Sequence, residues 1–195
     1  LICAPPANSL PNSLMRCRNT RMWTAPQCSG RAVMAPRWPD IWKTFVDLIP
    51  LEERDDLILA YQKRLFCGDM AVEHRYAQAW ASWENSLASV HYHGGGSAPG
   101  DYARAFARIE NHYFSNDGFL EFDGQILAHM DRIAHIPGVI VQGRYDMICP
   151  PQRAWELSQN WPAGELQIIR NAGHALSEPG ISEALVRAMD RFAAR

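Results

Sequence analysis

The chain has 195 residues, of which 47% are hydrophobic and 21% are charged, a composition typical of a soluble globular protein. Its net charge of −2 argues against a nucleic-acid partner, and no apolar run is long enough to cross a membrane. The five cysteines are odd in number and too scattered for a disulfide framework or a metal site, so we expect a cytoplasmic protein without metal or cofactor.

The first 37 residues differ from the rest of the chain. They contain five arginines and no acidic residue, together with five of the thirteen prolines. Neither helical nor strand periodicity runs through them. We predict that residues 1–37 are disordered or translated from a wrong reading frame, and we assign them no function.

Residues 38–135 have a helical pattern, with apolar residues recurring three and four positions apart in segments that begin near 41, 51, 70 and 102. We expect Asp40 and Asp101 to cap two of these helices, and a further helix over 125–135. The side chains expected in the core are Leu57, Ile58, Tyr61 and Leu65 of the second helix, Val72, Tyr76, Trp80, Trp83 and Leu87 of the third, and Tyr102, Phe106, Ile109 and Tyr113 of the fourth.

The remainder of the chain, 136–195, alternates strands and helices. An apolar run at 139–141 is bounded by glycines, which is typical of a buried parallel strand, and 166–169 is a second β-rich run. Pro150 and Pro151 precede a helical pattern over 152–160. A final helix, 181–192, is expected to pack on the sheet through Ile181, Leu185, Ala188, Met189 and Phe192. The order β-α-β-α predicts an α/β fold with two parallel strands.

An acid and an imidazole follow these two strands. Asp146 comes shortly after the first strand and His174 shortly after the second. Because parallel strands end at the same edge of a sheet, we expect the two side chains to lie close together. A buried Asp that orients a His makes up two thirds of a nucleophilic triad. The alternative is that Asp146 caps a helix and His174 is a solvated loop residue.

Several motifs resemble the proline iminopeptidases (prolyl aminopeptidases) of the α/β-hydrolase superfamily. They are GRYDMICP at 143–150, Ala-Gly-His at 172–174, ARIENHYF at 107–114 and Trp-Glu at 83–84, within a resemblance that covers 38–193. The resemblance implies an incomplete α/β-hydrolase fold. In it, residues 38–135 would be the helical cap domain, and residues 136–195 would hold the last two parallel strands with their helices.

Two glutamates, Glu84 and Glu110, lie at the border between the apolar and polar faces of their predicted helices. The residues alone favour ion pairs with a nearby arginine, such as Arg75, Arg104 or Arg108. The resemblance implies a different role, in which Glu84 and Glu110 hold the free α-amine of the substrate. The secondary ammonium of an N-terminal proline offers one positive charge and two N–H donors, which two carboxylates can satisfy.

The resemblance implies a serine exopeptidase that releases N-terminal proline from peptides, with His174 as general base and Asp146 as the residue that orients it. The sequence contains no Gly-x-Ser-x-Gly, the motif that carries the nucleophile in this fold. Ser97 does not replace it, because no strand precedes Ser97 and Pro99 occupies a position that requires glycine. We therefore expect a C-terminal fragment, inactive as given.

Two alternatives stay open. Another α/β-hydrolase, an esterase or an epoxide hydrolase, would use Asp146 and His174 but would not need two amine-binding glutamates. A non-catalytic interaction fragment would use only the helical block. The resemblance implies peptides with an N-terminal proline as partners. The sequence predicts no nucleic-acid partner and no membrane, and it leaves the oligomeric state undetermined.

Overall fold

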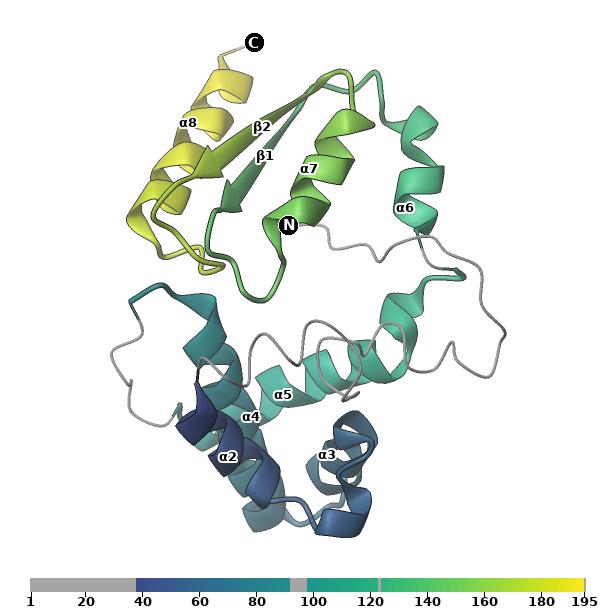
Figure 1. The fold of residues 1–195 in the computed structure, drawn as a ribbon, viewed down its shortest axis with the longest axis vertical. Helices are drawn as coiled ribbons and strands as arrows, with labels where there is room; N and C mark the ends of the chain where they lie inside the picture. The colour runs from purple at the N-terminus through teal and green to yellow at the C-terminus, as the bar shows by residue number, and fades with distance from the viewer. Residues whose placement is uncertain (1–37, 92–97, 123, 195) are drawn as a thin grey trace. The chain divides into compact units, whose positions relative to one another are not determined.

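The computed structural model describes residues 38–91, 98–122 and 124–194 (Figure 1). Residues 1–37 and Ser97, for which we made predictions from the sequence, lie outside these ranges. The described residues form two compact units, one of helices (38–86 and 98–120) and one with the strands (87–91, 121–122 and 124–194). No helix in the described ranges is long and apolar enough to span a membrane.

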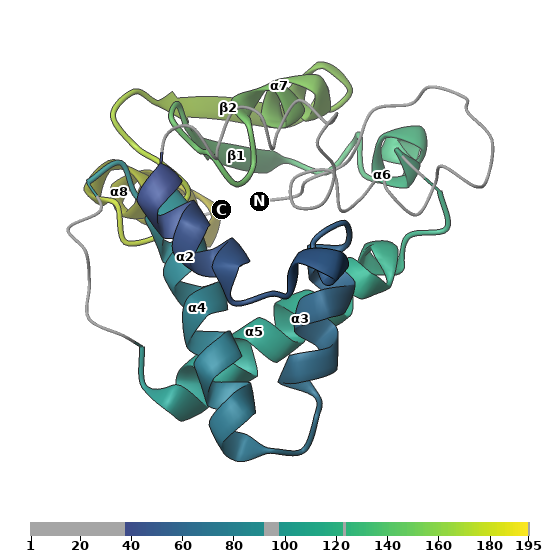
Figure 2. The ribbon, with the colours of Figure 1, turned by 60° about the horizontal axis from the view of Figure 1, so that its bottom comes forward.

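The helical unit contains four α-helices and two 3-10 turns within its described residues. They are α2 (Pro39–Asp47), η2 (Leu51–Glu53), α3 (Leu57–Leu65), α4 (Met70–Ala88), α5 (Gly100–Ser115) and η3 (Asp117–Phe119). Figures 1 and 2 both show α2 lying along α4. The last two residues of α4 belong to the unit with the strands.

Aromatic rings fill the core of the helical unit. Phe45 and Tyr61 stack with their ring centroids 4.3 Å apart, and the Tyr61 hydroxyl donates a hydrogen bond of 2.7 Å to the Phe45 carbonyl. Trp80 packs edge-on against Tyr61, with the centroids 5.4 Å apart. The predicted core of α3 and the burial of Trp80, Trp83 and Leu87 are confirmed, whereas Val72 and Tyr76 are partly exposed.

The predicted starts of three helices are wrong. Trp38 is the N-cap of α2, and Asp40 lies in its first turn. The second helix begins at Leu57, because Pro50 is followed by a separate 3-10 turn and the Asp56 side chain accepts a hydrogen bond from the Leu59 N–H. Pro99 precedes α5 as its N-cap, so Asp101 does not cap that helix.

The predicted core face of α5 is also wrong. Tyr102, Ile109 and Tyr113 are each more than half exposed, and the residues that α5 buries are Ala103, Ala107 and Asn111. The Asn111 side chain connects α5 to α3 by donating a hydrogen bond of 2.9 Å to the Ile58 carbonyl. Of the other large apolar side chains of α5, Phe106 is partly exposed, and Phe114 packs on Trp80 with the ring centroids 6.1 Å apart.

The second unit has the two predicted strands. Its elements are α6 (Gln125–Ala128), η4 (Met130–Arg132), β1 (Gly138–Gly143), α7 (Pro151–Gln159), β2 (Gly164–Ile169) and α8 (Pro179–Ala193). The strands pair in parallel, in a register that runs from Gly138 opposite Gly164 to Gly143 opposite Ile169. The α/β class and the parallel pair are thereby confirmed. The continuous helix predicted over 125–135 is replaced by the shorter α6 and η4.

The core of this unit lies between the sheet and α8. Val141, Ala172, Ile181 and Ala184 are buried together. Met189 is 68% exposed, so its predicted packing on the sheet is wrong. Ala188 is the buried residue on that turn of α8.

Candidate active site

The structure brings Asp146 and His174 together within the unit that holds the strands. Asp146 follows β1 and is 3% exposed, and its Oδ2 lies 3.0 Å from Nδ1 of His174, which follows β2. Because an ionised carboxylate can only accept, Nδ1 is the nitrogen that carries the proton. This tautomer leaves Nε2 of His174 able to accept a proton from another group.

The Asp146 carboxylate has donors on both of its oxygens. Oδ1 accepts the backbone N–H groups of Ile148 at 3.0 Å and Cys149 at 2.7 Å. Oδ2 accepts the side-chain amide of Gln142 at 3.1 Å in addition to His174. Our sequence reasoning missed Gln142. The signal was a polar residue near the end of an otherwise apolar strand.

Backbone contacts fix the loop that carries His174. The N–H groups of His174 and Ala175 both donate to the Ala88 carbonyl, at 2.7 and 2.8 Å. The loop also passes close to the end of β1, where a Cβ added to Gly143 would lie 1.9 Å from the Gly173 carbonyl oxygen. Only glycine fits at position 143, and the absence of a side chain there lets the loops after the two strands meet.

The helical unit contains the two predicted carboxylates. Glu84 lies on α4 and is 4% exposed, and its Oε1 has no hydrogen-bond partner among the described residues. Glu110 lies on α5 and accepts a hydrogen bond of 2.8 Å from the Trp80 indole N–H. Burial, and next the negative charge of Glu110, raise the pKa of Glu84 well above its usual value.

The arginines expected as partners for these glutamates have other contacts. Arg104 and Arg108 both form ion pairs with Glu73, the latter at 3.0 Å. Glu73 is almost fully buried, and its carboxylate also accepts the Gly68 N–H at 2.8 Å. The sequence did not indicate this ion-pair cluster, which accounts for two of the three arginines near Glu84 and Glu110 in sequence.

A buried carboxyl beside a second carboxylate is a suitable site for a cation. A bound ammonium would supply the donor that Glu84 Oε1 lacks and would offset the repulsion between Glu84 and Glu110. Within the described ranges, no three His, Cys, Asp or Glu side chains are grouped as ligands for a metal ion.

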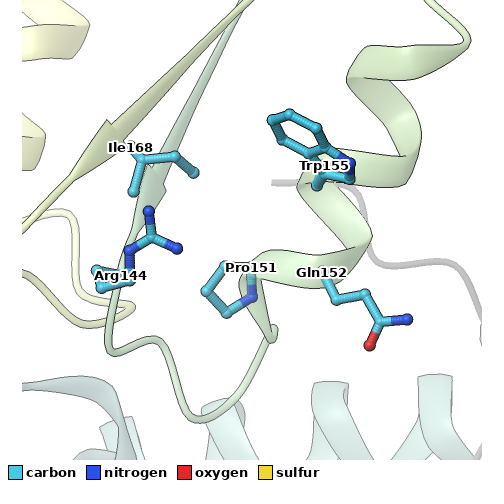
Figure 3. A pocket seen from close by; sticks show the side chains of 5 residues that line it. All are labelled: Arg144, Pro151, Gln152, Trp155 and Ile168. Atoms are coloured by element: carbon cyan, nitrogen blue, oxygen red, sulfur yellow. The ribbon is translucent and has the colours of Figure 1, made fainter.

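A separate pocket of about 320 Å³ lies beside α7 (Figure 3). Its lining residues are Arg144, Pro151, Gln152, Trp155 and Ile168. Asp146 and His174 do not line it. Support for the acid–imidazole pair therefore comes from its hydrogen bonds, and this pocket adds nothing to it.

This chain is similar to several curated proteins that are named proline iminopeptidases. The chain is 47% identical over 161 residues to a probable proline iminopeptidase of Leptolyngbya boryana, and 46% identical over 159 residues to a proline iminopeptidase of Xanthomonas citri. It is 45% identical over 161 residues to a proline iminopeptidase of Arabidopsis thaliana. These alignments cover 81%, 80% and 80% of this chain, and 50%, 51% and 42% of the respective relatives.

The chain thus spans about half the length of the curated relatives that it matches. No protein-family model matches it. The identity nevertheless extends over far more of the chain than the short motifs on which the resemblance was first based. The resemblance is confirmed: over about four fifths of its length, this chain is homologous to proline iminopeptidases.

Proposed function

We propose that this chain provides the acid–base pair and the amine-binding carboxylates of a serine exopeptidase that releases N-terminal proline from peptides. The observation that carries the proposal is the hydrogen bond between buried Asp146 and His174, in a chain homologous to proline iminopeptidases. In this proposal, β1 and β2 are part of a larger α/β-hydrolase sheet.

The proposed chemistry uses both nitrogens of the His174 ring. Nε2 takes the proton of a serine hydroxyl as it attacks the carbonyl carbon, and then gives that proton to the leaving amine. Asp146 holds Nδ1–H and stabilises the imidazolium that forms. Because the 195 residues contain no Gly-x-Ser-x-Gly, we place the serine and the oxyanion donors in the part of the relatives that this chain does not span.

Glu84 and Glu110 would select for a free amino terminus. The ammonium of an N-terminal proline has two N–H donors and one positive charge, and the two carboxyls offer acceptors and a negative charge in a buried setting. An acylated proline has neither the charge nor the N–H donors. The same pair therefore supports an exopeptidase over an esterase or an epoxide hydrolase.

Calorimetric titration of the 195-residue chain with prolinamide tests this role. We expect measurable binding at neutral pH, and at least tenfold weaker binding (about 1.4 kcal/mol) by the Glu84→Gln variant. Glu121→Gln, a matched change at an exposed position, should leave the affinity unchanged. Equal affinity for N-acetylprolinamide, which lacks the ammonium, would contradict the proposal. The cytoplasmic location stays a prediction from the cysteine content.

A further inference from the structure

Gln142 is a buried polar residue in the apolar strand β1. Its side chain is 2% exposed, and its Nε2 lies within hydrogen-bond distance of three oxygens. They are Asp146 Oδ2 at 3.1 Å, the Cys149 carbonyl at 3.0 Å and the Gly143 carbonyl at 3.1 Å. All three can only accept, so the chemistry of the neighbours establishes that the amide nitrogen, and not the amide oxygen, faces them.

The oxygen that Gln142 contacts is the one that binds His174. Oδ2 of Asp146 is shared by Gln142 Nε2 and His174 Nδ1, while Oδ1 is held by two backbone N–H groups. Four donors thus occupy the carboxylate, and its plane cannot rotate without breaking several bonds. With the Gln142 amide removed, His174 would be the sole donor to Oδ2 among the described residues, and that oxygen could turn with the imidazole.

Gln142 also ties the turn after β1 to the strand. The Gln142 amide donates a hydrogen bond to the carbonyl of Cys149, the last residue of the turn 146–149. The N–H of Cys149 in turn donates to Oδ1 of Asp146, the first residue of that turn. A buried amide costs free energy unless its donors are satisfied. The three oxygens near the Gln142 amide belong to this turn or to the strand end that leads into it.

We propose that Gln142 is a positioning residue for the acid–imidazole pair. It holds Asp146 Oδ2 in line with His174 Nδ1 and thereby keeps the proton on Nδ1, so that Nε2 stays the basic nitrogen. Its importance for turnover rests on the proposed function. The positioning itself is a property of the ground state and can be measured without substrate.

The test uses nuclear magnetic resonance on the ¹⁵N-labelled 195-residue chain. In the unaltered chain, the ¹⁵N shifts of the His174 ring should report the Nδ1-protonated tautomer, with an Nδ1–H proton that exchanges slowly with water. Gln142→Met keeps the length of the side chain and removes the donor. We expect at least tenfold faster exchange of the Nδ1–H proton and a mixture of the two tautomers in this variant.

Gln167→Met is the matched control. Gln167 lies on the neighbouring strand β2, and its side-chain amide donates a hydrogen bond to the exposed carboxylate of Glu165. This change should leave the His174 ring signals as they are in the unaltered chain. A Gln142→Met variant with unaltered ring shifts and proton exchange would overturn the proposal.

A second measurement needs no variant and remains decisive if Gln142→Met does not fold. In the unaltered chain, the side-chain amide protons of Gln142 should exchange slowly and show a cross-peak to the Nδ1–H of His174. Fast exchange without that cross-peak would overturn the proposal. If these signals are found but His174 proves dispensable for peptide hydrolysis after the chain is joined to the missing half of a relative, the proposed function fails and the positioning role stands.

Discussion

Glu84 is a residue whose protonation is coupled to folding. The carboxyl of the unfolded chain has the usual glutamate pKa of about 4.5, and burial together with the charge of Glu110 raises the pKa in the folded chain. At pH values between these two pKa values, the folded chain binds more protons than the unfolded chain. The contribution of Glu84 to stability is therefore greatest below pH 4.5 and is lost as the pH rises through the folded pKa.

The Glu84→Gln variant should consequently be more stable than the unaltered chain at pH 7.5. A neutral amide removes the buried charge, and we expect a gain of about 1 to 3 kcal/mol that disappears as the pH is lowered towards 4.5. Thermal unfolding followed by circular dichroism over this pH range measures the effect, with Glu121→Gln as the control at an exposed site. A variant that is less stable at every pH would contradict this account.

The sequence was sufficient to predict that Asp146 and His174 meet, because both follow parallel strands and such strands end at one edge of a sheet. It could not predict the contribution of Gln142, since one polar residue in a strand indicates neither its face nor its partners. The near-complete burial of the Glu84 side chain could likewise not be predicted from the sequence. A border position on an amphipathic helix becomes buried only when neighbouring helices cover it.

Helix α5 shows how element packing departs from a hydrophobic pattern. Its large apolar side chains recur at helical spacing, and on that basis they were expected to form the core. Helix α5 instead buries Ala103, Ala107 and Asn111, and the Asn111 side chain contacts α3. Hydrophobic periodicity identified the helix correctly, but the expectation that its large apolar residues mark the buried face was wrong.

Asn111 on this face should make a measurable contribution to the stability of the helical unit. Its side chain is fully buried and bonds to the Ile58 carbonyl on α3. Asn111→Ala leaves that carbonyl without its side-chain donor and opens a small cavity, so we expect a loss of about 2 kcal/mol in the free energy of unfolding.

Chemical denaturation measures this loss. Asn116→Ala is the matched control, because Asn116 is exposed and bonds within its own helix end. This control should change the free energy of unfolding by less than about 0.5 kcal/mol. An equal loss for the two variants would show that the bond between α5 and α3 is not what stabilises the unit.

At the scale of the whole chain, the sequence predicted a helical block followed by β-α-β-α, and the structure has that order. The predicted division at residue 135 came from the helical pattern, and the names cap domain and hydrolase core came from the resemblance; both stay predictions. The structure groups 87–91 with the strands, where the Ala88 carbonyl accepts two N–H groups from the His174 loop. Contacts between backbones so far apart in sequence leave no pattern that periodicity could show.

The central claim is that Asp146 and His174 serve a serine that this chain does not itself supply. Hydrolysis of proline p-nitroanilide tests it, measured for the 195-residue chain and for a chimera that joins the first half of the Xanthomonas citri relative to residues 38–195. We predict no turnover by the chain alone and turnover by the chimera.

Substitution of His174 in the chimera is the decisive measurement. In the chimera, His174→Ala should lower kcat at least about 1,000-fold, because the general base is lost, while His135→Ala, at an exposed histidine of the same unit, should leave kcat unchanged. Hydrolysis by the chain alone, or a chimera whose kcat survives His174→Ala, would contradict the account.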